Sequence, residues 1–167
     1  MDVRFINPFV KSICNTFETM CSVPVTIGKP EIKTDNGPGS DVSSIIGFSG
    51  DAAGSVALHF GFDIASKLAS KFAGIEITPE HDDFADAIGE LANMVAGGAK
   101  AQFEGVSVSI SLPNVIVGTN HNLSASKSVP RIMIPCKTEL GSFMVEIGMV
   151  LTKQPTGLVA ETAGATS

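Results

Sequence analysis

The sequence of 167 residues contains neither tryptophan nor tyrosine, and only 17% of its residues are charged. Without these two aromatic types, a site in which bases or sugars stack on tryptophan or tyrosine is not expected. The net charge is -6, and acidic and basic residues are mixed along the chain. Non-specific nucleic-acid binding needs a basic patch that displaces counterions, so we expect no nucleic-acid partner.

Cysteines and long apolar runs are also scarce. Cys14, Cys21 and Cys136 are odd in number and form no C-x-x-C pair, which predicts small core residues in a reducing cytoplasm rather than a disulfide framework. The longest uncharged run, 105–126, alternates valine and serine and contains proline and asparagine. It is typical of strands and a loop, so we expect no membrane span. The first residues show no signal-peptide pattern, and a cytoplasmic location is expected.

The chain does have enough apolar residues for one well-packed domain. Its hydrophobic content is 44%, and 167 residues are too few for two full domains. We expect a single domain over residues 1–152. Residues 153–167 are rich in alanine, threonine and glycine and are predicted to form a loosely held C-terminal tail.

An internal duplication is visible when the two halves of the chain are aligned. The pattern Val-x-Val-x-Ile-x-x-Pro occurs at 23–30 and again at 106–113. Farther along, Gly54-Ser begins a segment that matches one beginning with Gly141-Ser. The halves span about 3–60 and 79–151, and such self-similarity predicts two copies of one supersecondary unit.

Each half predicts a helix followed by three strands, and a short extra helix links the halves. The fold class expected is α/β (α+β), a two-layer sandwich of three helices on a mostly antiparallel six-stranded sheet. Pro8 is predicted to lie at the start of the first helix and to leave its first turn frayed. The expected helices are 4–20, 62–73 and 79–103, and the expected strands are 23–33, 42–49, 53–60, 106–117, 129–137 and 141–151.

The predicted helix 79–103 carries the most informative pattern of the chain. Asp86, Glu90, Asn93 and Gly97 are spaced by four, three and four residues, which stacks them on one side of an α-helix. Apolar residues at 84, 88, 91 and 95 fall on the opposite side and predict the buried face. A glycine in the outward row costs about 1 kcal/mol of helix stability, and close approach by another surface would explain it.

This row, in a duplicated helix-plus-three-strand chain, resembles the CheC/CheX/FliY family of chemotaxis phosphatases. The resemblance extends from Phe5 to Thr152, and the single motif in the second half, 90–100, is most similar to the CheX type. Members of the CheC type usually keep a motif in each half. Here the first helix has Asn7 and Val10 where a second copy would need glutamate and asparagine.

The resemblance implies that the chain hydrolyses the aspartyl phosphate of a response-regulator receiver domain of the CheY type. Asn93 would orient the attacking water, and Glu90 would pair with a lysine of the receiver. Asp86, Gly97 and Gly98 would contact the partner. The chain would have no cofactor of its own, since Mg²⁺ would come with the receiver domain.

The resemblance also implies a homodimer, and the long uncharged strand segments 106–110 and 115–117 are sheet edges that could pair with a second copy. Two other functions stay open from the sequence alone: a non-enzymatic module that binds a receiver domain, and a dimerisation domain. Other sites are not expected. His59, His81 and His121 lack metal-ligand spacing and are predicted to be structural or solvent-facing.

Overall fold

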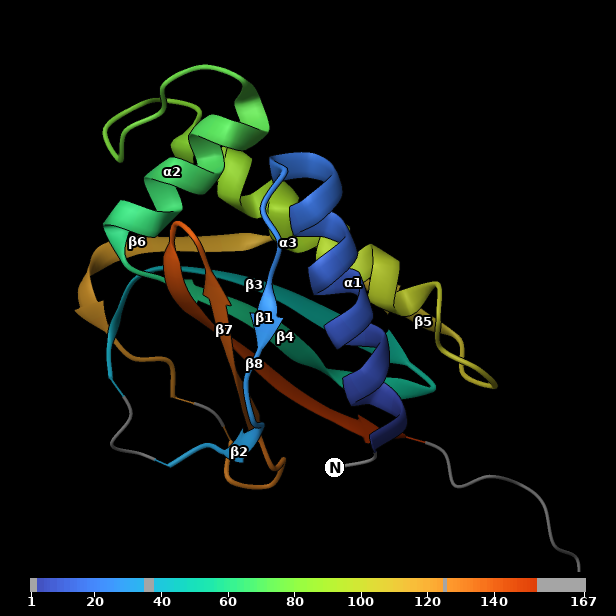
Figure 1. The fold of residues 1–167 in the computed structure, drawn as a ribbon. Coiled ribbons are helices and arrows are strands. Elements are labelled where there is room, and N and C mark those ends of the chain that lie inside the picture. Colours follow the sequence, from blue (N-terminus) through green and yellow to red (C-terminus); the bar gives the residue numbers. More distant parts are fainter. Residues whose placement is uncertain (1–2, 35–37, 125, 153–167) are drawn as a thin grey trace, which may run out of the picture.

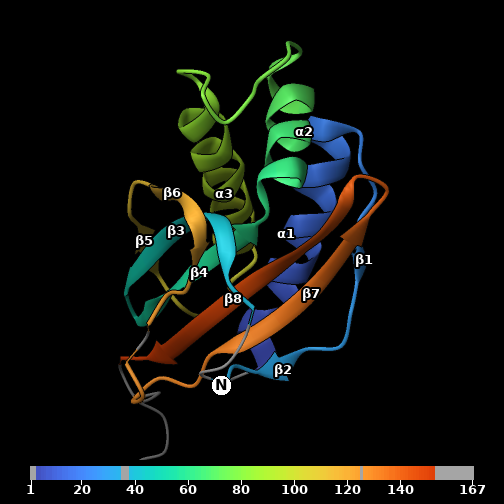
Figure 2. The same ribbon diagram turned by 90° about the vertical axis from the view of Figure 1, so that its left-hand side faces the viewer.

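A computed structural model describes residues 3–34, 38–124 and 126–152. In this part of the chain, eight strands form one twisted sheet, and three helices pack together against one face of it (Figures 1 and 2). The predicted fold class is therefore confirmed. No helix among the described residues is both long and apolar enough to cross a membrane. The predicted tail, 153–167, lies outside the described residues.

The elements follow one another in the predicted order. The helices are α1 (Val3–Cys21), α2 (Phe62–Ala73) and α3 (Phe84–Lys100). The strands are β1 (Thr26–Ile27), β2 (Glu31–Ile32), β3 (Ser40–Gly50), β4 (Ala52–Phe60), β5 (Val108–Ile110), β6 (Asn114–His121), β7 (Ile132–Thr138) and β8 (Gly141–Leu151).

Two of the six predicted strands are each divided into two. The segment expected at 23–33 forms β1 and β2, and the segment expected at 106–117 forms β5 and β6. Pro30 lies just before β2 and Pro113 just before β6, and these prolines occupy matching places in the duplication. Proline has no N–H to donate to a strand ladder, so each first strand is interrupted at the same place.

The sheet interleaves the two halves of the duplication. Its strand order is β1-β7-β8-β4-β3-β5, with β2 also paired to β7 and β6 also paired to β3. The third strand of each half, β4 or β8, lies at the centre, and each half's first strand segments pair with the second strand of the other half. All of these pairs are antiparallel.

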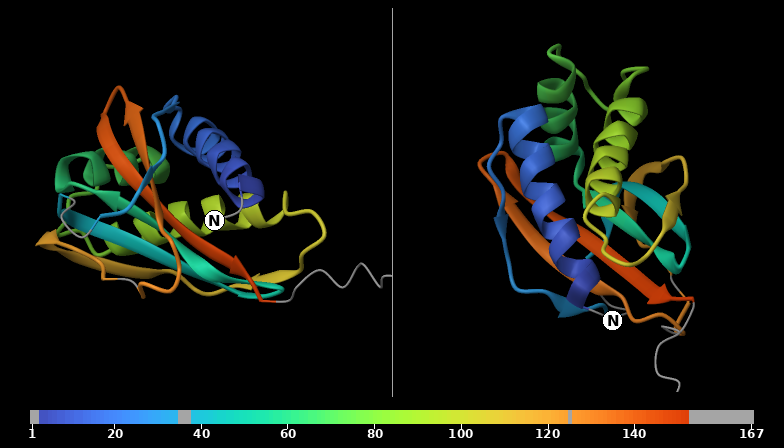
Figure 3. Two further views of the ribbon diagram at one scale, coloured as in Figure 1. Left: turned by 90° about the horizontal axis from the view of Figure 1, so that it is seen from below. Right: turned by 90° about the vertical axis from the view of Figure 1, so that its right-hand side faces the viewer.

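Helix α1 lies over the sheet (Figure 3), and aromatic side chains of the two elements are in contact. Phe17 of α1 stacks on Phe143 of β8 with ring centroids 4.9 Å apart, and Phe9 meets Phe48 of β3 edge-on at 5.6 Å. The prediction for Pro8 was wrong: α1 begins at Val3 and contains Pro8 in its interior. Burial of Pro8 beside Phe5 and Phe9 offsets the backbone hydrogen bond that the proline lacks.

Candidate functional site

Helix α3 is shorter at both ends than the sequence predicted. It begins at Phe84 rather than near Pro79, because residues 78–84 form turns with their own hydrogen bonds, from the His81 amide to the Thr78 carbonyl and from the Phe84 amide to the His81 carbonyl. It ends at Lys100, and the left-handed Gly105 follows after a further turn. The predicted row of residues 86–97 lies entirely within the helix.

The predicted inward and outward sides of α3 are both observed. Its apolar face is buried in the core through Phe84, Ile88, Leu91 and Val95. Asp86 and Glu90 are exposed, while Asn93 and Gly97 are half-buried. Within the described residues, no hydrogen bond or ion pair engages the side chains of these polar residues, so they are available to a partner.

One flank of this outward row is a groove between α3 and the start of β6. The groove has a volume of about 410 Å³ and is lined by Ala85, Asp86, Gly89, Glu90, Pro113 and Val115. A Cβ at Gly89 would lie 3.2 Å from Pro113 Cγ and 3.3 Å from Val115 Cγ2. The glycine therefore lets β6 approach the helix beside Glu90. Sequence reasoning missed this contact, although Gly89 in a helix was its visible signal.

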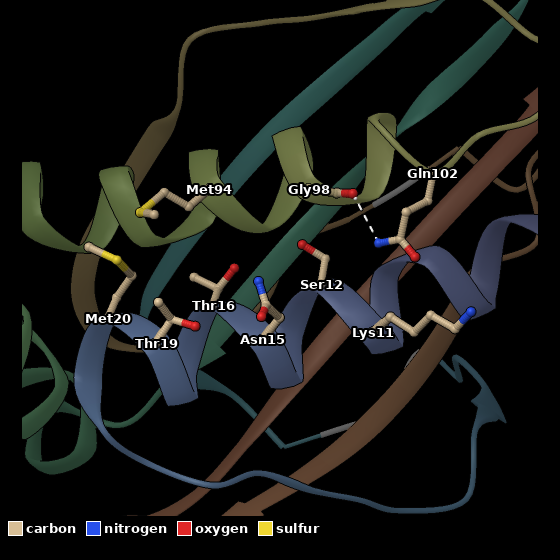
Figure 4. A pocket seen from close by; sticks show the side chains of 9 residues that line it. All are labelled: Lys11, Ser12, Asn15, Thr16, Thr19, Met20, Met94, Gly98 and Gln102. Atoms are coloured by element: carbon tan, nitrogen blue, oxygen red, sulfur yellow. Dashed lines mark hydrogen bonds between the residues drawn. The ribbon is translucent and has the colours of Figure 1, made fainter.

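The other flank is a groove between α3 and α1, shown in Figure 4. It has a volume of about 280 Å³, and its lining is mostly hydroxyl, amide and thioether groups. On the α3 side, the Gln102 amide donates a hydrogen bond to the Gly98 carbonyl at 3.0 Å. The lining residues are Lys11, Ser12, Asn15, Thr16, Thr19, Met20, Met94, Gly98 and Gln102. The outward row of α3 thus runs between two grooves.

The two glycines predicted to contact the partner, Gly97 and Gly98, differ in their surroundings. A Cβ at Gly98 would lie 2.3 Å from Ser12 Oγ of α1, and Ser12 Oγ donates a hydrogen bond to the Val95 carbonyl at 2.7 Å. Gly98 therefore serves the contact between α1 and α3 inside the chain. A Cβ at Gly97 would meet no atom within 4 Å. The fold therefore does not require a glycine at position 97. Of the two glycines, only Gly97 is still explained by the close approach of a partner.

The cysteines do not add a nucleophile to this site. Cys21 and Cys136 are buried as predicted, whereas Cys14 is only half-buried. Burial raises the pKa of Cys21 to about 11 and that of Cys136 to about 12, so neither thiol ionises near neutral pH. Within the described ranges, no group of three or more His, Cys, Asp and Glu side chains is placed to hold a metal ion.

A second polar cluster, missed by sequence reasoning, lies on the face of the sheet away from the helices. Glu146 of β8 is only 1% exposed, and its neighbours Val145 and Ile147 point into the helical core. Its carboxylate accepts hydrogen bonds from Lys33 Nζ at 2.9 Å, from His59 Nε2 at 3.0 Å and from Arg131 Nε. Burial raises its pKa, but these hydrogen bonds and the two cations outweigh burial and lower the pKa to about 2.

Because of the Glu146 carboxylate, we expect the folded chain to lose stability in acid. Because the folded pKa lies below the ordinary value of 4.5, Glu146 stabilises the fold above that value, and its contribution is lost as pH falls toward 2. The contribution is roughly 3 kcal/mol. Urea unfolding between pH 7 and pH 2 should show this loss in the native chain, and it should be much smaller in Glu146→Gln. The exposed Glu139→Gln is the control, and an acid-induced loss that persists in Glu146→Gln would contradict the assignment.

Comparison with known proteins identifies relatives over most of the chain. The family model described as "Chemotaxis phosphatase CheX" matches residues 42–137. A relative from Thermotoga maritima, named CheY-P phosphatase CheX, is 28% identical over 142 residues, which are 83% of this chain and 92% of the relative.

Solved structures share the fold. A CheC-like superfamily protein from Shewanella sp. PV-4 is 33% identical with a TM-score of 0.82, over 90% of this chain and 99% of that chain. The CheX–CheY–BeF3–Mg²⁺ complex from Borrelia burgdorferi contains a chain that is 23% identical with a TM-score of 0.74, over 89% of this chain and 99% of that chain. At this identity, the second comparison shows the fold alone.

Proposed function

The chain belongs to the CheX family of chemotaxis phosphatases, and on this premise we propose that it hydrolyses the aspartyl phosphate of a phosphorylated receiver domain of the CheY type. The observation that carries the proposal is the exposed row of α3. It presents a carboxylate, Glu90, and a carboxamide, Asn93, neither of which has a partner among the described residues.

The chemistry of acyl-phosphate hydrolysis suits so small a set of groups. Phosphoryl transfer is accelerated mainly by positioning and by electrostatic stabilisation, with little covalent work for the protein. A receiver domain supplies the phosphorylated aspartate, a Mg²⁺ ion and a lysine. The phosphatase then has only to place a water molecule in line with the bond that breaks. No cofactor held by this chain is needed.

Asn93 is the residue that we assign to the water. A carboxamide both accepts and donates a hydrogen bond, and it adds no negative charge beside a phosphoryl group. Asn93 is half-buried on a helix whose opposite face is locked in the core, so its backbone is held rigidly. Rigid placement is what in-line positioning of a water requires.

Glu90 is assigned to docking. It lies one turn before Asn93 on the same side of α3 and lines the groove beside β6. An acidic group carried to a phosphate site needs a cationic partner, because unpaired it would repel the phosphate. Pairing with the receiver's lysine satisfies this need and sets the register of the two proteins. Asp86, one turn earlier and lining the same groove, is given a supporting contact.

The direct test is the decay of a phosphorylated receiver domain with and without this chain. The receiver is phosphorylated with a small-molecule phosphodonor, and its remaining phosphate is followed after the donor is removed. Faster decay that scales with the amount of chain supports the proposed reaction. Tight binding to the receiver with unchanged decay would show a binding module instead, and an absence of both would contradict the proposal.

Gly97→Ala should separate fold stability from partner binding. The added methyl group meets no atom within 4 Å, and alanine is favoured over glycine in a helix by about 1 kcal/mol, so the chain should become more stable. Association with a receiver should weaken, because the methyl group would hold the two backbones apart. Chemical unfolding and calorimetric titration measure the two effects. Gly47→Ala, in β3 and away from the row, is the control, because its added methyl would come no closer than 3.5 Å to any atom; an unchanged affinity in Gly97→Ala would contradict the contact.

We also propose that the chain forms a homodimer through the outer edge of β6. This strand pairs with β3 on one side and with no other described strand. Its apolar residues Ile116 and Val117 are exposed, and Leu112 just before it is 85% exposed. Such an edge is a ready template for strand pairing, and two-fold dimers are the commonest closed assembly. In this arrangement, the outward row on α3 of each protomer would stay open to a receiver domain.

Light scattering at micromolar concentration measures the assembly directly. The expected mass is about twice the 17.3 kDa of one chain. Lysine in place of Val117 should shift the mass toward one chain, because charged residues blunt a sheet edge. A mass near 17.3 kDa for the native chain would contradict the dimer. Since receiver domains act inside the cell, we also propose a cytoplasmic location for the protein.

A further inference from the structure

Four strands bring one continuous row of hydrogen-bonding groups together on the face of the sheet away from the helices. Ser43 of β3 lies between two imidazoles: its Oγ is 2.8 Å from His59 Nδ1 of β4 and 2.7 Å from His121 Nε2 of β6. The far nitrogens also have partners. His59 Nε2 is 3.0 Å from Glu146 Oε2, and His121 Nδ1 is 2.7 Å from the Gly118 carbonyl.

The two ends of this row fix two of the imidazole protons. The Glu146 carboxylate accepts hydrogen bonds and has none to donate, so His59 Nε2 carries a proton. The Gly118 carbonyl likewise only accepts, so His121 Nδ1 carries a proton. If both histidines were neutral, His59 Nδ1 and His121 Nε2 would each present a bare lone pair to the same Ser43 hydroxyl.

A single hydroxyl has one proton and cannot donate to both nitrogens. With both imidazoles neutral, one of the two contacts of Ser43 Oγ would therefore set two lone pairs against each other at less than 3 Å. Such a contact is costly here, because Ser43 is 0% exposed and bulk water does not replace the missing hydrogen bond. Four hydrogen bonds need four protons, and two neutral imidazoles and one hydroxyl supply three. One additional proton completes the row whichever of the two imidazoles carries it.

We propose that His59 and His121 share one extra proton through Ser43, and that this proton ties the end of β6 to the centre of the sheet. When His59 carries it, Nδ1 donates to Ser43 and Ser43 donates to His121. When His121 carries it, the hydroxyl turns and both middle hydrogen bonds reverse. A second extra proton would place two positive charges on either side of one oxygen, and the serine proton would have no acceptor in the row.

The charged groups around the row are on the same face. Among the residues that the structure describes, Glu146 is the only carboxylate that contacts either imidazole, and it is shared with the cations of Lys33 and Arg131. At the other end, the Asp41 carboxylate accepts a hydrogen bond from the backbone N–H of Asn120, next to His121. The carboxylates at both ends favour an added proton. The two cations beside Glu146 oppose it and are themselves held by that carboxylate.

The consequence is a pH-dependent attachment of β6. Free imidazoles titrate near pH 6.5, and a proton held by the folded row stabilises the fold at lower pH and is lost as pH rises. One of the four hydrogen bonds is then broken, and the end of β6 is held more weakly, by its backbone pairing with β3. The attachment lies at the end of β6, whereas Val115, which lines the groove beside Glu90, lies at its start.

Nuclear magnetic resonance of the whole ¹⁵N-labelled chain tests the proposal without any receiver domain. Long-range ¹H–¹⁵N spectra distinguish protonated from bare ring nitrogens. At pH 7, His59 and His121 together should hold one extra proton. Amide exchange over residues 114–121, corrected for its intrinsic pH dependence, should lose about fivefold protection when the shared proton leaves, which is the usual effect of one hydrogen bond.

Two serine variants make the test specific to the row. Ser43→Ala removes the bridge, so the two imidazoles should titrate separately and the protection step should disappear. Ser44→Ala is the matched control, because this neighbouring serine is also buried and its Oγ has no hydrogen-bond partner. Two neutral imidazoles at pH 7, or an unchanged titration in Ser43→Ala, would overturn the proposal. Neither outcome bears on the phosphatase reaction, which is measured separately.

Discussion

Replacement of Asn93 by alanine is expected to slow receiver dephosphorylation about 100-fold or more, the usual cost of removing one positioned polar group from a reaction site. The change removes the carboxamide assigned to the water and leaves Glu90 in place for docking. Within the described residues Asn93 bonds to no other side chain, so its loss leaves no buried group unpaired. The free energy of unfolding should therefore change by no more than about 0.5 kcal/mol.

Three measurements together decide the role of Asn93. Single-turnover decay of the phosphorylated receiver gives the chemical rate, calorimetric titration gives affinity, and urea unfolding gives stability. Asn93→Asp should also be slow, because a carboxylate adds negative charge beside the phosphoryl group. Asn15→Ala, an exposed amide on α1, is the control. A near-native rate in Asn93→Ala would refute the mechanism, and loss of affinity without loss of rate would make Asn93 a docking residue.

Replacement of Gly54 by alanine is expected to have the largest effect on stability of any change considered. Gly54 lies in β4 at the centre of the sheet with φ of +152°. A Cβ there would lie 1.9 Å from the Gly148 carbonyl oxygen of β8 and 2.8 Å from Met149 Cα. These are backbone atoms of the neighbouring strand, so no side-chain rotation relieves the overlap.

The expected loss exceeds about 4 kcal/mol, a large part of the 5–15 kcal/mol by which native proteins are usually stable. The variant should be unfolded or insoluble, as circular dichroism and the soluble fraction would show. Gly47→Ala is the matched control, because it lies in the paired strand β3 and its Cβ would come no closer than 3.5 Å to any atom, Ser111 Oγ. A Gly54→Ala chain with near-native stability would contradict the pairing of β4 with β8.

The sequence by itself determined the local features of this protein, because local structure depends on periodicity and on turn residues. The extra helix was predicted at 62–73 and observed over the same residues, since its apolar spacing is regular and Gly74 ends it in a left-handed conformation. The outward row of α3 was predicted for the same reason: a 3.6-residue period separates a buried side from an exposed side without reference to the rest of the fold. The roles of Asn93 in placing the water and of Glu90 in docking stay a proposal, as does the domain boundary at 152.

Only the tertiary structure decided which distant segments meet. The duplication predicted two similar halves, but not that their first strands would be exchanged between them, because strand pairing depends on non-local burial. The same holds for the glycines: both 97 and 98 were predicted to contact the partner, and only the packing of Ser12 against α3 shows that Gly98 serves a contact inside the chain. The row from Glu146 to His121 joins residues from four strands, and a shared proton depends on distances between side chains that no spacing along the chain encodes.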